Sequence, residues 1–513
     1  MISIIKTIAL NGLEGELIEV QTDITSGLPN FEIVGLPDIS VRESKERIKS
    51  AIKNSNIEFP SRKILINLAP ANTKKWGTSY DLPIAIGILK SLEKIKNEKL
   101  ENTIFIGELS LNGKINHVNG VLPICIEAVN LGIKRIFLPK ANEREASIIK
   151  GLEIIGVKNL NECIEYLNQN KKIEIEKINI RNVLNKENDK EVIDFSDVKG
   201  QENVKRALEI SAAGGHNCIL IGSPGAGKTM LAKRLVTILP DLTFEEALEI
   251  TKIHSISGKL NNTVGIVTRR PFRSPHHTIS TISMVGGGRI PVPGEISLAH
   301  YGVLFLDELP EFNRNTLEVL RCPLEEKSIT ISRLYTTVSY PANFMLIASM
   351  NPCPCGYYGS TEKECTCSKQ MIQKYLAKIS GPLLDRIDIH IDVKPIKYEK
   401  LSNYTNIETS KEIKERVNRA RQIQYIRYQK ESIISNSELT VKMIEKYCKL
   451  NEQSKKILEI AFNKLGLSAR AYSKILKVAR TIADLDGKEN INEKHIAEAI
   501  QLRSLDKKYG DKF

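Results

Sequence analysis

The stretch CILIGSPGAGKTMLAKRL, residues 218–235, decides the fold of this chain. Residues 218–221 are apolar and have the length of a short buried strand. Residues 222–229, GSPGAGKT, fit the pattern G-x-x-x-x-G-K-[ST], in which glycines let backbone N–H groups turn inward around phosphates. The next residues favour a helix, whose N-terminus attracts anions. Strand, loop and helix in this order predict a nucleotide site in a parallel α/β sheet.

Each polar group of this loop has an expected task. The ammonium group of Lys228 supplies a positive charge to the β- and γ-phosphates, and the hydroxyl of Thr229 completes the coordination of Mg²⁺. The sequence therefore predicts ATP and Mg²⁺ as ligands. The expected binding residues are Gly222, Ser223, Pro224, Gly225, Ala226, Gly227, Lys228, Thr229 and, from a later strand, Asp307.

Two further apolar runs end in polar residues. Residues 303–306, VLFL, lead into Asp307 and Glu308, and residues 344–348, FMLIA, lead to Asn351. Because the carboxyl ends of parallel strands meet at one edge of a sheet, these side chains are expected beside the phosphate loop. Asp307 is expected to hold Mg²⁺ and Glu308 to orient the attacking water. Asn351 is a candidate for contact with the γ-phosphate or the water, although an Asn before Pro is also ordinary turn chemistry.

The composition is that of a globular protein of several domains. The chain has 513 residues, 41% hydrophobic and 26% charged, with a net charge of +13. Residues 397–513 carry 25 basic and 16 acidic side chains, a net charge of +9, which fits either contact with a polyanion or a solvated helical surface. The sequence has no signal-peptide pattern and no apolar run long enough to span a membrane, so we expect a cytoplasmic protein without a membrane partner.

Four regions are expected along the chain. They are an α/β domain over 1–167, a charged linker over 168–193, an α/β core over 194–396 and a helical domain over 397–513. In the first region, residues 64–68 and 135–138 favour buried strands, and residues 41–54 and 123–131 favour helices.

The phosphate loop, the acid-ended strand and the Asn-tipped strand, in this order, resemble an AAA+ ATPase. Residues 195–201, FSDVKGQ, resemble the segment that packs near adenine in that family. Residues 382–388, PLLDRID, resemble the arginine-finger segment of the magnesium-chelatase branch, which implies a catalytic role for Arg386. Residues 467–472, LSARAY, resemble the start of the sensor-2 helix, which implies one for Arg470. The guanidinium group of arginine carries a fixed charge on a planar, forked group, and this suits both the arginine-finger and the sensor-2 role.

Two further segments resemble insertions of the magnesium-chelatase branch. Residues 269–277, RRPFRSPHH, and 284–289, MVGGGR, resemble its helix-2 insertion, and residues 326–338 resemble its pre-sensor-1 hairpin. Such loops face the central pore of the ring in relatives. This implies four candidate DNA contacts, and the alternative is that these residues pair with nearby acids or line subunit contacts. The candidates are Arg269, Arg270, Arg273 and Arg333.

The chain has nine cysteines, and four of them lie within fifteen residues: Cys353, Cys355, Cys365 and Cys367. Four thiolates at this spacing can form a tetrahedral Zn²⁺ site, and free thiols are the alternative. The other five cysteines lie in apolar or mixed runs and are expected in the core: Cys125, Cys163, Cys218, Cys322 and Cys448.

The first region resembles the proteolytic domain of Lon, with a ribosomal-protein-S5-like α/β fold. Residues 107–115, 120–123 and 128–139 carry this resemblance. The alignment places Leu122 where Lon has its catalytic lysine, and Ser79 lies near the serine position. Because a serine without a base is a weak nucleophile, we expect the fold without proteolysis.

Taken together, the chain resembles the YifB/ComM family of magnesium-chelatase-like AAA+ ATPases. Residues 31–38 (FEIVGLPD), 41–44 (VRES), 272–277 (FRSPHH) and 351–356 (NPCPCG) match that family in particular. The resemblance implies a homo-hexameric ring that uses ATP to move single-stranded and branched DNA in recombination during natural transformation. The alternative is a chelatase-like remodeller that acts on a protein or helps to insert a metal into a tetrapyrrole.

Overall fold

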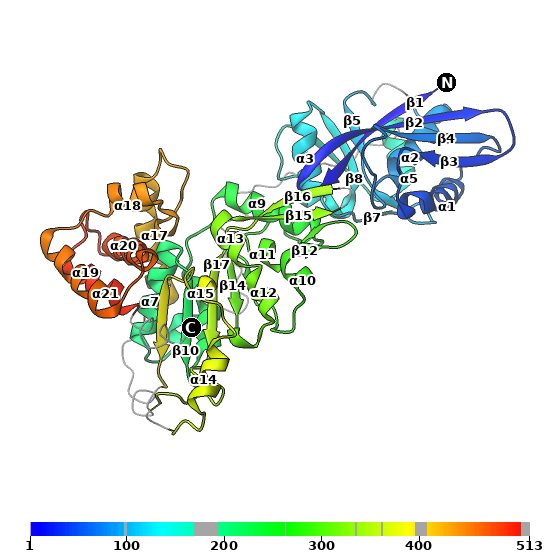
Figure 1. The fold of residues 1–513 in the computed structure, drawn as a ribbon. Helices are drawn as coiled ribbons and strands as arrows, with labels where there is room; N and C mark the ends of the chain where they lie inside the picture. The colour runs from blue at the N-terminus through cyan, green and yellow to red at the C-terminus, as the bar shows by residue number, and fades with distance from the viewer. Residues whose placement is uncertain are drawn as a thin grey trace.

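We describe the fold from a computed structural model of the chain (Figure 1). The structure describes residues 2–96, 100–168, 193–261, 263–333, 336–360, 363–395 and 408–503. Nearly all of the expected linker lies outside the described residues. Within them, no helix combines the length and the apolar character that a membrane crossing requires.

A seven-stranded mixed sheet organises the N-terminal region, in the order β3-β4-β2-β1-β5-β8-β9. The pairs β1/β2 and β2/β4 are antiparallel, and the other four pairs are parallel. The strands are β1 (Ser3–Asn11), β2 (Glu14–Thr25), β3 (Asn30–Val34), β4 (Lys63–Ala69), β5 (Thr103–Phe105), β8 (Arg135–Pro139) and β9 (Glu153–Val157). The strands expected at 64–68 and 135–138 are confirmed as β4 and β8.

Among the described residues, five α-helices and a small hairpin accompany this sheet. They are α1 (Ile39–Asn54), α2 (Asp81–Ser91), α3 (Val121–Asn130), α4 (Glu143–Ala146), α5 (Leu160–Leu167), β6 (Glu108–Leu109) and β7 (Ile115–Asn116). The two expected helices are confirmed as α1 and α3. Asp38 caps α1 by accepting a hydrogen bond from the N–H of Val41, which fixes where the helix begins. Helix α2 is apolar along most of its length and packs against β1 and β2 in the core.

The central core is a five-stranded sheet with the order β11-β14-β17-β10-β18 and every pair parallel. Its strands are β11 (Phe272–Arg273), β14 (Val303–Leu306), β17 (Met345–Met350), β10 (Cys218–Gly222) and β18 (Ile389–Val393). The main helices are α7 (Glu202–Gly214), α8 (Lys228–Ile238) and α9 (Phe244–Ile256). Strands β10, β14 and β17 are fully buried, as expected for parallel strands covered on both faces.

Short elements extend from this core. They are α10 (Thr281–Val285), β12 (Gly286–Gly287), β13 (Val292–Pro293), α11 (Glu295–Leu298), α12 (Arg314–Glu318), α13 (Arg321–Glu326), α14 (Lys369–Leu376) and α15 (Gly381–Leu384). The expected hairpin is confirmed as β15 (Ser328–Arg333) and β16 (Thr336–Pro341). The assignment of 269–277 to an insertion was partly wrong, because Phe272 and Arg273 form the edge strand β11 of the main sheet. The ring of Phe272 stacks on that of Phe305, with centroids 5.8 Å apart, which holds the strand there.

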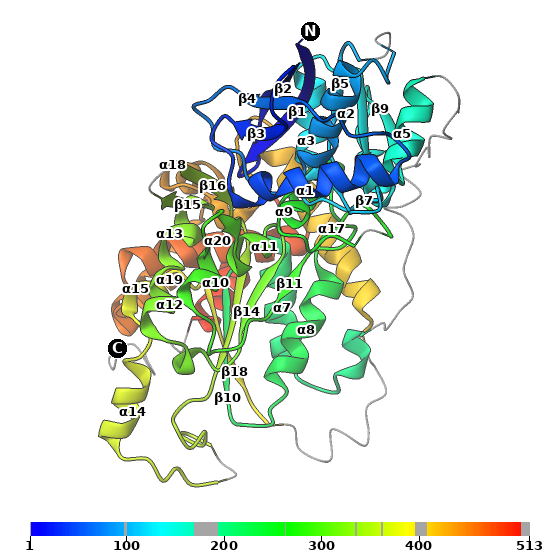
Figure 2. The same ribbon diagram turned by 90° about the vertical axis from the view of Figure 1, so that its right-hand side faces the viewer.

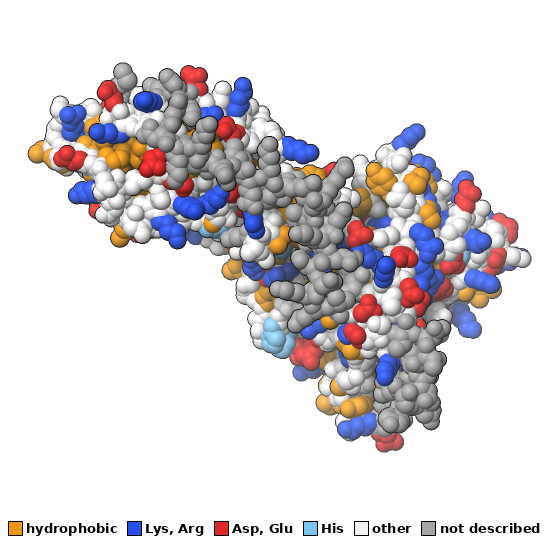
Figure 3. Space-filling view, turned by 180° about the vertical axis from the view of Figure 1, so that it is seen from behind, with side chains coloured by type: hydrophobic (Ala, Val, Ile, Leu, Met, Phe, Trp, Pro, Cys, Tyr) orange, Lys and Arg blue, Asp and Glu red, His pale blue; other side chains and the backbone are white. Residues whose placement is uncertain are grey.

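The C-terminal region is helical, as expected. It contains α17 (Ser410–Arg427), α18 (Val441–Tyr447), α19 (Glu452–Leu465), α20 (Ala469–Leu485) and α21 (Glu493–Gln501). Its apolar side chains share one core with α7, α8 and the central sheet. On the face shown in Figure 3, the basic and acidic side chains of the described residues are interspersed over this region. This face therefore fits the solvated surface that was the alternative to polyanion contact.

The N-terminal region packs against α9 and the β15–β16 hairpin (Figures 1 and 2). Leu122 and Ile148 form a small apolar cluster with Ala247 and Ile266 of the central core. Beside the cluster, the buried carboxylate of Glu145 accepts hydrogen bonds from the N–H of Leu122 and the hydroxyl of Ser255. An apolar cluster beside a buried carboxylate whose hydrogen bonds are made resembles a protein interior. These contacts hold the N-terminal region against the central core.

Candidate functional site

The phosphate loop connects β10 to α8 at the carboxyl edge of the central sheet. Gly225 and Gly227 have φ angles of 77° and 84°, in the left-handed region that glycine enters without strain. At Gly222, an added Cβ would lie 2.2 Å from the carbonyl oxygen of Val393 on β18. The glycines therefore serve two purposes: two of them turn the loop, and the third lets neighbouring strands approach closely.

Lys228 begins α8 and its side chain lies inside the loop. Its ammonium group donates hydrogen bonds to the carbonyl oxygens of Gly222 and Ser223, at 2.7 and 2.9 Å, and to Oδ1 of Asn351, at 3.0 Å. Partial burial lowers the pKa of Lys228, and the nearby carboxylates of Asp307 and Glu308 act in the opposite direction. The ammonium group is thus held where the loop would surround a phosphate.

Asp307 lies at the end of β14 and faces the same loop. Its Oδ2 accepts a 2.7 Å hydrogen bond from the hydroxyl of Thr229, and its Oδ1 accepts a short one from Ser349 at the end of β17. One carboxylate and one hydroxyl side by side are hard oxygen ligands of the kind Mg²⁺ prefers beside nucleotide phosphates. The residues present therefore fit Mg²⁺. Ser349 was not predicted from the sequence, because a serine within an apolar strand gives no signal of its own.

Glu308 follows in an unusual backbone conformation. Its φ angle is 52°, which is rare for a residue with a side chain, and its side chain is 60% exposed. Its Oε2 lies 3.9 Å from Nδ1 of His277. His277 also packs its ring against His276 and against the edge of Phe312. The motif FRSPHH marked His277 as a family feature, but only the fold places it beside Glu308.

Arg386 and Arg470 both contact groups outside the phosphate loop. The guanidinium of Arg386 pairs with Glu325 on α13 at 2.5 Å and donates to the carbonyl oxygens of Arg321 and Pro382. Nη1 of Arg470, at the start of α20, lies 3.2 Å from Oδ2 of Asp385. The structure therefore brings together the candidate residues around Lys228, whereas Arg386 and Arg470 contact other groups, Arg470 through Asp385, the residue before Arg386.

The four arginine candidates for DNA contact have different surroundings. Arg270 is largely buried, pairs with Glu246 at 2.8 Å, and donates to three carbonyl oxygens. Arg273 forms a two-pronged ion pair with Glu295, at 2.6 and 2.8 Å. The alternative, pairing with nearby acids, therefore describes Arg270 and Arg273. Arg269 and Arg333 are exposed, and Arg333 forms no ion pair within the described residues.

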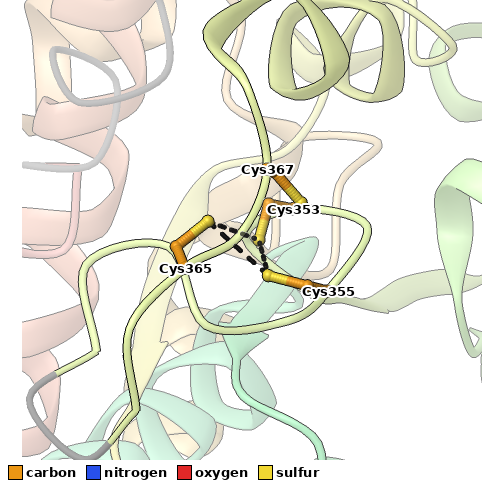
Figure 4. Close-up of side chains that lie close together, drawn as sticks. All are labelled: Cys353, Cys355, Cys365 and Cys367. Carbon is orange, nitrogen blue, oxygen red and sulfur yellow. Dashed lines mark hydrogen bonds between the residues drawn. The ribbon is translucent and has the colours of Figure 1, made fainter.

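The four clustered cysteines come together after β17 (Figure 4). Their sulfur atoms all lie within 4.8 Å of one another, and three of the separations are 3.3, 3.5 and 3.7 Å. A tetrahedral metal with sulfur ligands at about 2.3 Å separates its ligands by about 3.8 Å, so the cluster fits one Zn²⁺ ion. A hydrogen bond from the backbone of Tyr357 is the main reason that the pKa of Cys355 falls to about 6.

The cysteine cluster also touches the phosphate loop. Gly356 has a φ angle of 86°, and an added Cβ there would lie 2.5 Å from Cδ of Pro224. Its N–H donates to the carbonyl oxygen of Cys353, which closes a tight turn between two of the thiols. The turn that presents the sulfur atoms is therefore packed directly on the loop that presents Lys228.

Two other expectations concern residues away from these sites. Cys322 is exposed on α13, so its assignment to the core was wrong, whereas Cys125, Cys163, Cys218 and Cys448 are buried as expected. A short helix presents one face to solvent, and Cys322 lies on that face. Leu122, which the Lon resemblance places at the position of a catalytic lysine, is fully buried in the cluster with Ile148 and Ala247.

Three family models match successive parts of the chain, and all three describe subunit ChlI of magnesium chelatase. Residues 194–401 match the family model "Magnesium chelatase, subunit ChlI", residues 20–142 match "Subunit ChlI of Mg-chelatase", and residues 407–503 match "Magnesium chelatase, subunit ChlI C-terminal".

Two individual relatives match nearly the whole chain, and a third matches part of it. Competence protein ComM of Haemophilus influenzae is 41% identical over 506 residues, 98% of each chain. The uncharacterized protein YifB of Escherichia coli is 43% identical over 518 residues, 99% of this chain and 98% of its own. Lon protease 2 of Bacillus subtilis is 27% identical over 169 residues, 29% of this chain and 30% of its own. Similarity of this extent, with the α/β sheet and the helical C-terminal region, shows that the chain belongs to the ComM/YifB family of magnesium-chelatase-like AAA+ proteins.

Proposed function

We propose that this protein is a ring-shaped, homo-hexameric ATPase that moves single-stranded and branched DNA. The observation that carries the proposal is the meeting of Lys228, Thr229, Asp307, Glu308 and Asn351 at one edge of the sheet, with Arg386 and Arg470 held elsewhere. Among the described residues, these two arginines contact Glu325, Asp385 and backbone carbonyl oxygens, not the phosphate loop. A neighbouring subunit can supply the arginines, because arginine fingers are commonly given in trans.

The residues divide the chemistry among them. Lys228 would bind phosphates, Thr229 and Asp307 would hold Mg²⁺, and the ion would supply neutralisation of phosphate charge. Glu308 orients the attacking water, and Asn351 fixes the position of Lys228 through a 3.0 Å hydrogen bond. Zn²⁺ held by the four thiolates is assigned a structural role, because four protein ligands leave no open coordination position.

Two observations support the proposal that DNA is the substrate: the name of one relative and the exposed basic residues. The Haemophilus influenzae relative is named a competence protein, and competence is the uptake of DNA by a cell. Arg333 lies next to the tip of the β15–β16 hairpin and forms no ion pair within the described residues. A loop of this kind can contact phosphates without reading bases.

The test is a labelled four-way or three-strand DNA junction with ATP and the full-length protein. We expect ATP-dependent movement, stimulation of hydrolysis by DNA, and loss of movement with hydrolysis retained in Arg333→Ala. Lys464→Ala removes an exposed charge from α19 and is the matched control, with movement unchanged. A hexamer that hydrolyses ATP but neither binds nor moves any junction would refute the proposal.

A second candidate is a chelatase-like remodeller of a protein or metal-insertion partner. The match of residues 194–401 to the magnesium-chelatase model favours it, because that model covers the whole nucleotide site. The two candidates differ in what stimulates ATP hydrolysis. Stimulation by single-stranded or branched DNA supports the motor, and stimulation by a protein partner with no response to DNA supports the remodeller.

A further inference from the structure

Trp76 is the only tryptophan in the chain, and it lies where the N-terminal region meets the central core. Its ring is partly exposed. The ammonium group of Lys74 lies 4.3 Å from the ring centroid, and the guanidinium carbon of Arg289 lies 5.7 Å from it. Lys74 belongs to the same loop as Trp76, whereas Arg289 lies between β12 and β13 of the core. One aromatic ring is thus contacted by cations from two regions of the protein.

The loop that carries Trp76 is firmly anchored. The backbone N–H of Lys75 donates to the carbonyl oxygen of Leu36, at 3.2 Å, and the carbonyl oxygen of Lys75 accepts from Asp38, at 3.0 Å. The side chain of Lys75 is fully buried, and its ammonium group donates to the carbonyl oxygen of Pro70. The backbone next to Trp76 is therefore fixed, so the ring needs little ordering when it binds another group.

The basic surface continues from Trp76 to the β15–β16 hairpin. A Cβ added at Gly287 would lie 2.8 Å from Nη2 of Arg333, so the guanidinium of Arg333 rests against β12, two residues from Arg289. The turn between β1 and β2 packs on the same hairpin, where a Cβ at Gly12 would lie 2.2 Å from Cγ1 of Val338. The N-terminal region and the hairpin are thus joined beside this surface.

The charges on this surface differ from those of the neighbouring arginines. Arg270 and Arg273 are each matched by a carboxylate. By contrast, Arg289 and Arg333 are exposed and form no ion pair with any residue that the structure describes. Exposed cations that lack acidic partners attract an anion, and the aromatic ring of Trp76 beside Arg289 offers a face for stacking. Phosphates and unpaired bases of a single nucleic-acid strand supply both groups at once.

From this arrangement we propose that Trp76, Lys74, Arg289 and Arg333 form a binding site for single-stranded DNA. A base stacks on the indole of Trp76 in place of a cation, and Lys74 and Arg289 each contact a phosphate of the same strand. Arg333 contacts the same strand farther along. The proposal rests on the proposed function and adds that the N-terminal region contacts the DNA directly.

The test uses the fluorescence of the only tryptophan in the full-length protein. Single-stranded oligo(dT) is expected to quench Trp76 in a saturable way, whereas blunt duplex of equal charge is expected to bind without comparable quenching. Trp76→Ala is expected to weaken oligo(dT) binding by about 5- to 150-fold, the range for one stacked base, and Trp76→Phe to retain most of it. Lys74→Ala and Arg289→Ala are each expected to lower the log–log salt slope by about 0.7, and Lys464→Ala to leave it unchanged.

The outcomes separate this inference from the proposed function. Suppose that oligo(dT) binds to saturation with unchanged Trp76 fluorescence, and that Trp76→Ala binds oligo(dT) like the parent. Trp76 then only packs between the two regions, and this inference is wrong. The motor proposal then stands, provided the junction still moves. If the intact protein binds no DNA at all, both proposals fail together.

Discussion

Nζ of Lys228 and Oδ1 of Asn351 are joined by a 3.0 Å hydrogen bond across 123 residues of sequence. Lys228 starts α8 and Asn351 follows β17, so the bond connects the phosphate loop to the next strand of the sheet. A lysine that is already held by an amide and two carbonyl oxygens needs little rearrangement to meet a phosphate. The site is therefore organised by contacts within the chain.

The first prediction concerns the division between binding and hydrolysis. Lys228→Ala is expected to abolish nucleotide binding, because the charge that meets the phosphates is lost. Glu308→Gln is expected to bind nucleotide normally and to lower turnover by about 100-fold or more, because it removes the group that acts on the water. Fluorescent-nucleotide titration and steady-state ATPase assays measure the two effects. Parent-level turnover in Glu308→Gln would show that another residue is the base.

The second prediction concerns His277, whose ring lies 3.9 Å from the carboxylate of Glu308. His277→Ala is expected to lower kcat by about 10-fold or more while nucleotide affinity stays the same, because Glu308 loses the neighbour that orients it. His276→Ala is the matched control, since the ring of His276 packs against that of His277 but makes no contact with Glu308 among the described residues. Equal kcat in the two variants would assign His277 a packing role only.

The third prediction concerns the two arginines around Asp385. Arg386→Ala and Arg470→Ala subunits are each expected to be inactive alone and to regain hydrolysis when mixed with Lys228→Ala subunits. Mixed interfaces then pair one intact loop with one intact set of arginines. The measurement is ATPase activity across mixing ratios, with mixed rings verified by native mass spectrometry. Verified mixed rings without activity at any ratio would exclude action across the subunit boundary.

The fourth prediction concerns metal at the cysteine cluster. Protein purified without added metal is expected to contain about one Zn²⁺ per chain by elemental analysis. Because Gly356 packs on Pro224, chelation of the metal or Cys355→Ser is expected to weaken nucleotide binding as well as stability. Cys322→Ser, at the exposed cysteine outside the cluster, is the control and should bind nucleotide like the parent. Folded, active protein without metal would contradict this prediction.

The fifth prediction concerns pH and the buried contact between the core and the C-terminal helices. Nδ1 of His216 lies 3.0 Å from Oδ2 of Asp388, and Nε2 lies 2.8 Å from the hydroxyl of Thr481 on α20. Burial lowers the pKa of His216, with the bond to Asp388 opposing the shift. A lowered pKa means that the unfolded chain binds the proton more tightly. This contribution to stability is therefore complete above about pH 6.5, the ordinary value for histidine, and is lost as the pH falls below it.

Thermal unfolding from about pH 8 down to about pH 5 measures this effect. One group contributes at most about 1.4 kcal/mol per pH unit. His254 and His495 also have lowered pKa values from burial and act in the same direction. His216→Asn, which can still donate to Asp388, is therefore expected to flatten the pH dependence in part. An unchanged slope in this variant would remove His216 from the explanation.

The sequence alone determined the phosphate loop, the two polar strand ends, the hairpin and the helical C-terminal region. Each of these depends on residues that are close together in the chain: an apolar run, a glycine spacing, or a periodicity of 2 or 3.6 residues. The cysteine cluster was also accessible, since four thiols within fifteen residues have few ways to stay apart.

Only the tertiary structure decided which charges remain available and which residues meet across the chain. The sequence gives no way to tell Arg270, Arg273 and Arg333 apart. In the fold, Glu246 pairs with Arg270 and Glu295 pairs with Arg273. In the same way, folding brings His277 to Glu308, Gly356 to Pro224, and Arg289 to Trp76. The physical reason is that local backbone preferences fix the elements. Ion pairs and ring contacts depend on packing between elements far apart in sequence, which no local pattern encodes.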